Sequence, residues 1–225
     1  MKFSVITLFP EVIKPYLEGS IIGRAIKNKH ISVKVFNLRD FIKGKHRKAD
    51  DRAYGGGPGM VMYAEPVVAA VRAAMRGVKN KNKAAIVFMD AGGKEFTDKV
   101  SADFAEKYER IVLVCGHYEG IDERAPKIIK DLGYQLIKLS IGPYVLTGGE
   151  LPALVVIDSV SRKISGVLGK SESLEENRLG VGVPQYTRPE VIKAGKKKYL
   201  VPKVLMSGHH KKIEEWRRQH KSSKP

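Results

Sequence analysis

Short apolar runs alternate with helix-like segments along most of the chain, and this pattern limits the folds that it can adopt. Five runs rich in β-branched residues are typical of buried strands: Phe3–Leu8, Ile31–Phe36, Ala84–Met89, Ile111–Cys115 and Leu136–Leu139. Helix-like segments occupy Pro66–Met75, Asp98–Tyr108, Asp122–Leu132 and Leu154–Ile164. Because strands that alternate with helices form largely parallel sheets, the sequence predicts an α/β domain.

A loop rich in glycine and proline joins the last strand-like run to the last helix-like run. It reads IGPYVLTGGELP over residues 141–152. Glycine allows a ligand to approach the main chain closely, and proline fixes a backbone dihedral. The loop lacks the glycine patterns that bind phosphate. It therefore predicts main-chain recognition of a flat, polar ligand, with an ordinary strand-to-helix connection as the alternative.

Two further glycine-bearing loops follow predicted strands. Residues 115–124 read CGHYEGIDER, and residues 89–93 read MDAGG. Since parallel strands end at the same edge of a sheet, where α/β folds bind ligands, we expect all three loops to converge on one pocket. Glu119, between two glycines, is a candidate functional carboxylate. Asp122 is better placed to cap the helix that follows it.

Basic residues are in excess, with 41 Lys and Arg against 24 Asp and Glu and a formal net charge of +17. This excess favours a polyanionic partner, because each neutralised phosphate releases counterions; a role in solubility is the alternative. His46–Met60 combines basic side chains, paired acids, a tyrosine and four glycines. Such residues grip phosphates, bond base edges and stack on bases. The segment indicates nucleic-acid binding, with a disordered basic linker as the alternative.

Other features exclude several classes of protein. The single cysteine, Cys115, excludes an internal disulfide and a zinc site built from several cysteines. His209 and His210 form a poor metal pair, because adjacent side chains point in different directions. The first residues read as a strand and not as a signal peptide, and no apolar run is long enough to span a membrane. We therefore expect a soluble, cytoplasmic protein.

Five motifs occur in the order found in one family of enzymes. They are DDRAYGGGPGM (50–60), CGHYEGIDER (115–124), IGPYVLTGGELPA (141–153), IDSVSRKISGVLG (157–169) and PQYTRPEV (184–191). With these motifs the chain closely resembles the bacterial tRNA (guanine-N1)-methyltransferases of the SPOUT class. The resemblance implies a parallel-sheet α/β fold with a C-terminal trefoil knot, which topology rules alone would not predict. It also implies a homodimer that transfers a methyl group from S-adenosylmethionine to the guanosine immediately 3′ of the anticodon in tRNA.

The resemblance further implies roles for individual residues. The donor site would comprise Gly116, Ile141, Gly142, Pro143, Tyr144, Val145, Leu146, Gly148 and Gly149. The flipped guanine and its neighbour would be held by Asp50, Arg52, Tyr54 and Gly59. Glu119 would lie near the methyl group and help to place a magnesium ion. Arg162 would stabilise the charge that develops on guanine O6.

The sequence departs from the family at the position of the general base. The family places an aspartate after a Ser-Leu-Glu-Glu stretch, and this chain has Asn177 there. An asparagine side chain cannot accept a proton at neutral pH. We expect Glu176 to take over the role. Glu175, another group, or weakened catalysis are the alternatives.

Three parts are expected along the chain. They are a methyltransferase domain over residues 1–166, a mobile linker over residues 167–188 and a basic, helical, tRNA-binding segment over residues 189–225 that is shorter than the family's C-terminal domain. Ile213 and Trp216 would share one helix face in that segment. Two rival functions stay open. One is methylation of a different guanosine in tRNA or rRNA, and the other is RNA binding with little catalysis because of Asn177.

Overall fold

The computed structural model describes residues 1–44, 47–168 and 183–220. The chain divides into two compact units, residues 1–168 and residues 169–225. Within the described ranges, no helix combines the length and the apolar character that crossing a membrane requires.

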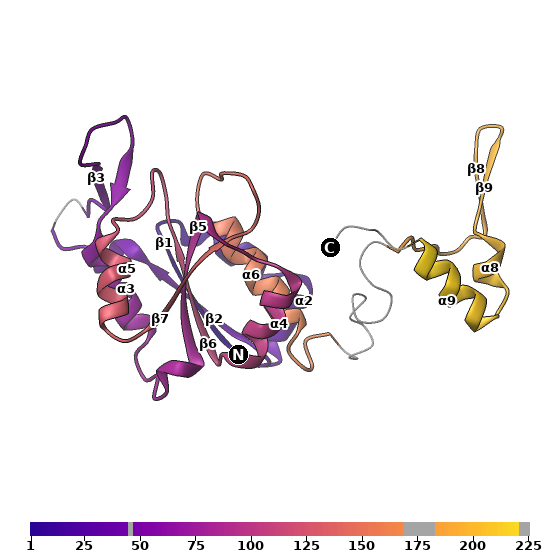
Figure 1. The fold of residues 1–225 in the computed structure, drawn as a ribbon, viewed down its shortest axis with the longest axis horizontal. Coiled ribbons are helices and arrows are strands. Elements are labelled where there is room, and N and C mark those ends of the chain that lie inside the picture. The colour runs from indigo at the N-terminus through magenta and orange to yellow at the C-terminus, as the bar shows by residue number, and fades with distance from the viewer. Residues whose placement is uncertain (45–46, 169–182, 221–225) are drawn as a thin grey trace. The chain divides into compact units, whose positions relative to one another are not determined.

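The first unit is built on a five-stranded sheet in the order β2-β1-β6-β5-β7 (Figure 1). Its strands are β1 (Lys2–Thr7), β2 (Ser32–Asn37), β5 (Ala84–Glu95), β6 (Arg110–Cys115) and β7 (Gln135–Ser140). Every neighbouring pair is parallel. The expected α/β fold with a parallel sheet is confirmed, and all five predicted strands are present.

Helices cover both faces of this sheet (Figure 1). They are α1 (Pro10–Glu18), α2 (Ser20–Lys27), α3 (Ala64–Ala74), α4 (Asp98–Lys107), α5 (Arg124–Asp131) and α6 (Glu150–Arg162), with short 3-10 turns at Leu38–Phe41 and Lys81–Lys83. Successive side chains of a strand point to opposite faces. Accordingly, Ile111 and Leu113 of β6 pack in the core under α1, α2, α4 and α6. Val112 and Val114 pack in the core under α3 and α5.

The expectation that residues 89–93 form a loop after a strand is wrong. Strand β5 continues to Glu95, and both Met89 and Lys94 pair with Leu139 across a bulge. The backbone of β7 lies against the bulge, because a Cβ atom on Gly93 would stand 2.5 Å from the carbonyl carbon of Lys138. Only glycine allows this approach, so β5 resumes its pairing beyond the bulge.

In the second unit the described residues begin at Val183. They include the antiparallel strands β8 (Val191–Ala194) and β9 (Lys197–Leu200), and the helices α8 (Lys203–Met206) and α9 (His210–Gln219). The segment that we expected to be helical therefore also contains a hairpin. Ile213 and Trp216 both lie in α9, where the Trp216 ring stacks on His220 with centroids 4.2 Å apart. Most of the expected linker, residues 169–182, lies outside the described residues.

Candidate active site

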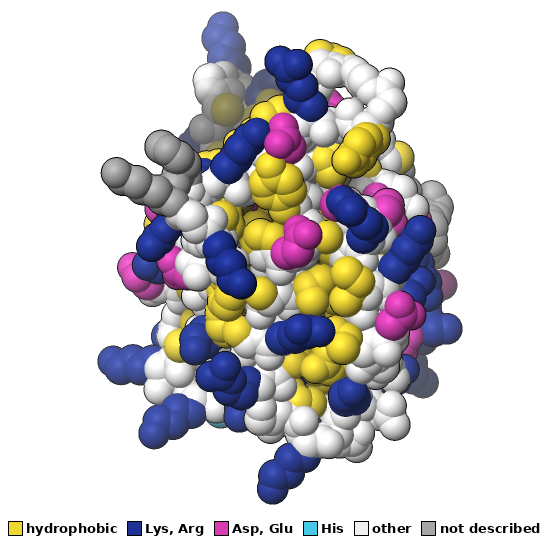
Figure 2. Space-filling model, turned by 90° about the vertical axis from the view of Figure 1, so that its left-hand side faces the viewer, with side chains coloured by type: hydrophobic (Ala, Val, Ile, Leu, Met, Phe, Trp, Pro, Cys, Tyr) yellow, Lys and Arg dark blue, Asp and Glu magenta, His cyan; other side chains and the backbone are white. Residues whose placement is uncertain are grey.

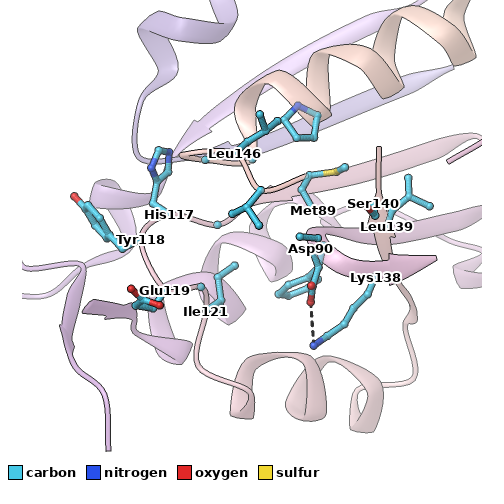
Figure 3. A pocket seen from close by; sticks show the side chains of 18 of the residues that line it. Met89, Asp90, His117, Tyr118, Glu119, Ile121, Lys138, Leu139, Ser140 and Leu146 are labelled. Carbon is cyan, nitrogen blue, oxygen red and sulfur yellow. Dashed lines mark ion pairs between the residues drawn. The ribbon is translucent and has the colours of Figure 1, made fainter. Parts of the chain in front are cut away.

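A pocket of about 490 Å³ lies at the carboxyl edge of the sheet (Figure 3). Three segments line most of it: residues 88–91 at the bulge of β5, residues 116–123 after β6, and residues 138–141 and 144–149 at and after the end of β7. The predicted convergence of the three glycine-bearing segments is therefore confirmed.

Glycines bring these segments together backbone to backbone. A Cβ atom on Gly149 would stand 2.6 Å from Cys115 Cα. The Gly149 N–H donates to the Gly116 carbonyl at 3.0 Å, and Gly148 forms an antiparallel bridge with His117. A Cβ atom on Gly148 would stand 2.3 Å from the His117 ring. Any larger residue at either glycine would push the two loops apart.

Seven of the nine residues assigned to the donor line this pocket. They are Gly116, Ile141, Tyr144, Val145, Leu146, Gly148 and Gly149. Gly142 and Pro143 belong to the same loop but are not among the lining residues. Tyr144 folds back over Gly142, where a Cβ atom would stand 2.4 Å from the ring. Its hydroxyl donates to the Ile141 carbonyl at 3.1 Å, which gives the loop a compact turn.

The segment predicted to bind nucleic acid is bonded to the same pocket. Most of it belongs to an antiparallel hairpin of β3 (Asp50–Arg52) and β4 (Met60–Met62). Strand β4 also bonds the loop after β6, because the Glu119 N–H donates to the Met60 carbonyl at 3.0 Å. A Cβ atom on Gly59 would stand 1.9 Å from Glu119 Cγ. Gly59 and Glu119, which the resemblance assigns to different roles, are thus in contact.

The other residues assigned to the guanine lie on the hairpin, and they are not among the residues that line the pocket. Asp50 and Arg52 belong to β3, and the side chain of Tyr54 is 99% exposed. Lys and Arg side chains spread over this face of the first unit (Figure 2). The arrangement presents an exposed ring beside basic charge, which suits an unpaired base and its phosphates.

Asp51, which we did not predict, anchors the hairpin. The Tyr63 hydroxyl donates to Asp51 Oδ2 at 2.7 Å, and Lys48 Nζ lies 3.0 Å from Oδ1. The hydrogen bond from Tyr63, followed by those from the Arg52 N–H and Lys48, lowers the pKa of Asp51 to about 2. The Asp51 carboxylate is therefore ionised at neutral pH.

Asp122 bonds the first residue of the helix that follows it, although the N-cap position itself is Glu123, whose side chain makes no cap hydrogen bond. Asp122 Oδ1 accepts a hydrogen bond from the Arg124 N–H at 2.9 Å, and α5 begins at Arg124. The Arg124 side chain also bonds both carboxylate oxygens. These bonds, the side-chain one above all, lower the pKa of Asp122. This carboxylate thus has a structural role at the pocket edge.

An ion-pair cluster on the pocket wall was not predicted. Lys138 Nζ lies 3.2 Å from Asp90 Oδ2 (Figure 3). It also donates to Glu123 Oε1. The hydrogen bond from Lys138 to Glu123 is the largest cause of a rise in the pKa of Lys138. Burial opposes this rise and Asp90 adds to it, so Lys138 keeps its positive charge. The cluster exists because the bulge of β5 places Asp90 beside β7. No short sequence pattern signals it.

A buried polar cluster below the loops was also missed. Glu150, the first residue of α6, is 4% exposed and lies 2.7 Å from His117 Nε2. The Thr7 hydroxyl donates to its other oxygen. Cys115 is buried beside them, and burial raises the pKa of its thiol, with Glu150 as a second cause. The contact between His117 and Glu150 was not predicted, because the two residues are 33 positions apart and belong to separate motifs.

One predicted catalytic residue, Arg162, is not among the residues that line this pocket, and another, Glu176, is not described by the structure. Arg162 is the last residue of α6, and the 13 residues of that helix place it about 18 Å from Glu150. Arg162 is not among the residues that line the pocket of its own chain. Glu176 and Asn177 lie outside the described residues.

The described residues hold no metal site built from three or more ligand side chains. Within residues 1–44, 47–168 and 183–220, no group of three or more His, Cys, Asp or Glu side chains is placed to hold a metal. Magnesium usually keeps several waters and takes only one or two carboxylates from a protein, so the magnesium ion stays a prediction.

The sequence was compared with known families and proteins. The family described as tRNA (Guanine-1)-methyltransferase TrmD matches residues 1–225. A tRNA (guanine-N(1)-)-methyltransferase from Ruminiclostridium cellulolyticum is 47% identical over 222 residues, which are 97% of this chain and 90% of the relative. Proteins of the same name from Clostridium perfringens strain 13 and Lachnospira eligens are 45% and 47% identical, covering 97% of this chain and 87% and 89% of the relatives. The chain therefore belongs to the tRNA (guanine-1)-methyltransferase family.

Proposed function

We propose that the chain transfers a methyl group from S-adenosylmethionine to N1 of the guanosine immediately 3′ of the anticodon in tRNA. The chain is a methyltransferase by its family. The observation that carries the proposal is a preformed pocket of glycine-rich loops bonded to the hairpin of β3 and β4. A protein that only bound RNA would not need so complete a pocket, which argues against the rival without catalysis.

The pocket suits S-adenosylmethionine. Its walls offer main-chain groups at Gly148 and apolar side chains such as Ile141 and Leu146. Pockets of this kind bind small ligands with a few fixed polar contacts. The donor carries no phosphate, which agrees with a loop that has no phosphate-binding pattern. When bound, it supplies an electrophilic methyl group on a sulfonium.

Methylation at guanine N1 requires that this nitrogen lose its proton while charge develops on O6. The guanine must also leave the base stack to reach the pocket. Tyr54, which is almost fully exposed, is available to stack on an unpaired base, and Asp50 and Arg52 lie on the adjoining strand. Glu119 lies between this hairpin and the donor pocket. Arg162 stabilises the charge on O6 as a preorganised donor.

The functional unit is a homodimer. Apolar side chains are exposed on α1 and α6, at Val12, Tyr16, Leu151 and Val155. Exposed apolar patches of this kind mark interaction surfaces. The Tyr16 hydroxyl donates to Asp158 Oδ2 at 2.6 Å and so joins the two helices into one face. Because Arg162 is remote from the pocket of its own chain, a second copy supplies it.

The loops around the pocket form a trefoil knot. Two contacts support this proposal: the backbone of Gly149 against Cys115 and Gly116, and that of Gly93 against Lys138 and Leu139. Both require segments from different strands to pass each other without intervening side chains.

Each part of the chain has its own role. Residues 1–166 carry catalysis, residues 167–188 link the two flanking parts, and residues 189–225 add affinity for tRNA. The protein acts in the cytoplasm. The β8–β9 hairpin supports the last role, because it carries exposed Lys193, Lys197 and Lys198. Glu176 accepts the N1 proton in place of the family's aspartate.

The direct test is transfer of labelled methyl from S-adenosylmethionine to an unmodified tRNA transcript, with the product base mapped. The transcript carries two guanosines across the 3′ edge of the anticodon. We expect label on N1 of the second guanosine. A transcript with adenosine at that position is the control and should stay unlabelled. Label at another guanosine would favour the first rival, and no label despite binding of donor and tRNA would favour the second.

A further inference from the structure

Glu150 is a carboxylate buried below the pocket, and the chemistry proposed above does not use it. Its side chain is 6% exposed and it begins α6. Burying a carboxylate is costly unless hydrogen bonds satisfy its oxygens. Both oxygens are satisfied here, one by the Thr7 hydroxyl and the other by His117 Nε2 at 2.7 Å.

Three separate elements meet at this carboxylate. Thr7 ends β1, His117 follows β6, and Glu150 begins α6. His117 Nε2 lies within hydrogen-bond distance of Glu150 Oε2, so the imidazole ties the loop after β6 to the start of α6. The Thr7 oxygen in turn accepts from the Phe9 N–H at 2.8 Å, and the Phe9 ring packs edge-on against His117 with centroids 4.6 Å apart. Hydrogen bonds and ring packing therefore hold Thr7, His117 and Glu150 in place.

The end of the glycine-rich loop rests directly on this cluster. A Cβ atom on Gly148 would stand 2.3 Å from His117 Cε1 and 2.6 Å from Glu150 Oε2. The next residue, Gly149, donates its N–H to Gly116 at 3.0 Å. A movement of His117 or Glu150 would therefore be passed to the main chain of residues 148 and 149, which line the pocket.

We propose that Glu150 and Thr7 are positioning residues that act through His117 and hold the 141–149 loop in its donor-binding shape before the donor arrives. A loop that is ordered in advance loses less conformational entropy on binding. This inference rests on the proposed function in naming S-adenosylmethionine as the ligand. The ordering of the loop itself does not depend on that name.

The first test compares Thr7→Val, which removes only the hydroxyl, with Thr7→Ser, which retains it. We expect Thr7→Val to weaken calorimetric binding of S-adenosylhomocysteine about tenfold, and Thr7→Ser to bind like the wild-type chain. The KM for S-adenosylmethionine should rise by the same factor while kcat at saturating donor changes less. Glu150→Gln should behave like Thr7→Val.

A matched control separates positioning from general loss of stability. Thr97 Oγ1 caps α4 by accepting a hydrogen bond from the Val100 N–H at 3.3 Å, and Thr97→Ala removes this cap. Thr97 is not among the residues that line the pocket. This variant should melt at a lower temperature and bind S-adenosylhomocysteine unchanged. If its affinity falls as much as that of Thr7→Val at an equal loss of melting temperature, the positioning role is refuted.

Amide hydrogen exchange of the ligand-free chain tests directly whether the cluster orders the 141–149 loop. We expect the Gly149 amide to exchange faster in Thr7→Val than in the wild-type chain, and the amides of central β6 to stay protected. Equal Gly149 exchange in the two would overturn the inference. If the wild-type chain fails to bind S-adenosylhomocysteine while Gly149 still responds, the proposed function fails and the ordering of the loop stands.

Discussion

Glu119 lies directly over Gly59, although the two residues are 60 positions apart in the sequence. A Cβ atom on Gly59 would stand 1.9 Å from Glu119 Cγ and 2.4 Å from Oε1. The Glu119 carboxylate can therefore lie between the hairpin and the pocket only because residue 59 is a glycine.

Substitution of Gly59 should affect the rate more than donor binding. In Gly59→Ala the new methyl group displaces Glu119, and a shift of about 1 Å near reacting atoms can cost about 10²-fold in rate. We expect such a fall in kcat, with affinity for S-adenosylhomocysteine changed less. Steady-state rates with tRNA and calorimetry measure the two effects. Gly19→Ala, where an added Cβ atom meets its nearest neighbour at 3.8 Å, is the control and should keep the wild-type rate.

The bulge of β5 offers two adjacent glycines with different surroundings. An added Cβ atom on Gly93 would overlap the backbone of β7, whereas one on Gly92 would meet only Asp90 Oδ1 at an ordinary 3.5 Å. Gly93→Ala should lower the free energy of unfolding by about 1–3 kcal/mol. Gly92→Ala should change it by no more than about 0.5 kcal/mol. Urea unfolding measures both, and equal effects would contradict the packing described for the bulge.

Titration of Asp51 should depend on Tyr63. Because hydrogen bonds lower the pKa of Asp51 from 3.8 to about 2, they stabilise the fold above the ordinary pKa, and this contribution is lost as the pH falls toward 2. Tyr63→Phe removes the largest cause and should raise this pKa. Carboxyl ¹³C NMR in the two proteins measures the shift. Tyr134→Phe should leave the pKa of Asp51 unchanged, and an unchanged pKa in Tyr63→Phe would refute the assignment.

A mixed dimer tests whether two chains share each active site. Glu119→Gln and Arg162→Ala chains, each of which we expect to be inactive alone, are coexpressed with different tags and the mixed dimer is purified. If Arg162 acts across the interface, one site carries both defects and the other carries none. The mixed dimer should then show about half of the wild-type rate. A mixed dimer as inactive as its parents would place Glu119 and Arg162 in the same site of one chain.

The general base is tested at Glu176. If Glu176 is the proton acceptor, Glu176→Gln should lower kcat about 10²–10⁴-fold, because the amide cannot take the proton. Glu175→Gln alters the neighbouring carboxylate and is the matched control, with an expected rate near that of the wild-type chain. Asn177→Asp restores the family's residue and should rescue Glu176→Gln. Unchanged methyl transfer by Glu176→Gln would exclude this assignment.

The strands of the sheet could be predicted because each is a short run of β-branched, apolar residues. The region Pro10–Lys27, which forms α1 and α2, was missed. Pro15 lies inside α1, and Gly19 separates the two helices, so the sequence does not show one continuous helical period. The hairpin of β8 and β9 was missed because its positions are exposed and show no alternation.

The candidate site was predictable to the extent that motifs carry it. The glycine-rich loops and their convergence follow from where predicted strands end. The contacts of Lys138 with Asp90 and of Glu150 with His117 could not be predicted, since they join residues that only the folded sheet brings together. The same holds for the distance of Arg162 from the pocket, which depends on the length and direction of α6.

The only cysteine of the sequence lies beneath the pocket, and this placement makes it a natural probe. Cys115 is buried below Gly149, and burial raises its pKa, so a thiol reagent reacts with it only when the loops separate. The rate of alkylation of the unmodified chain would then measure how often the loops open, with no engineered label. A ligand that closes them would slow the labelling, which gives a simple screen for compounds that bind here.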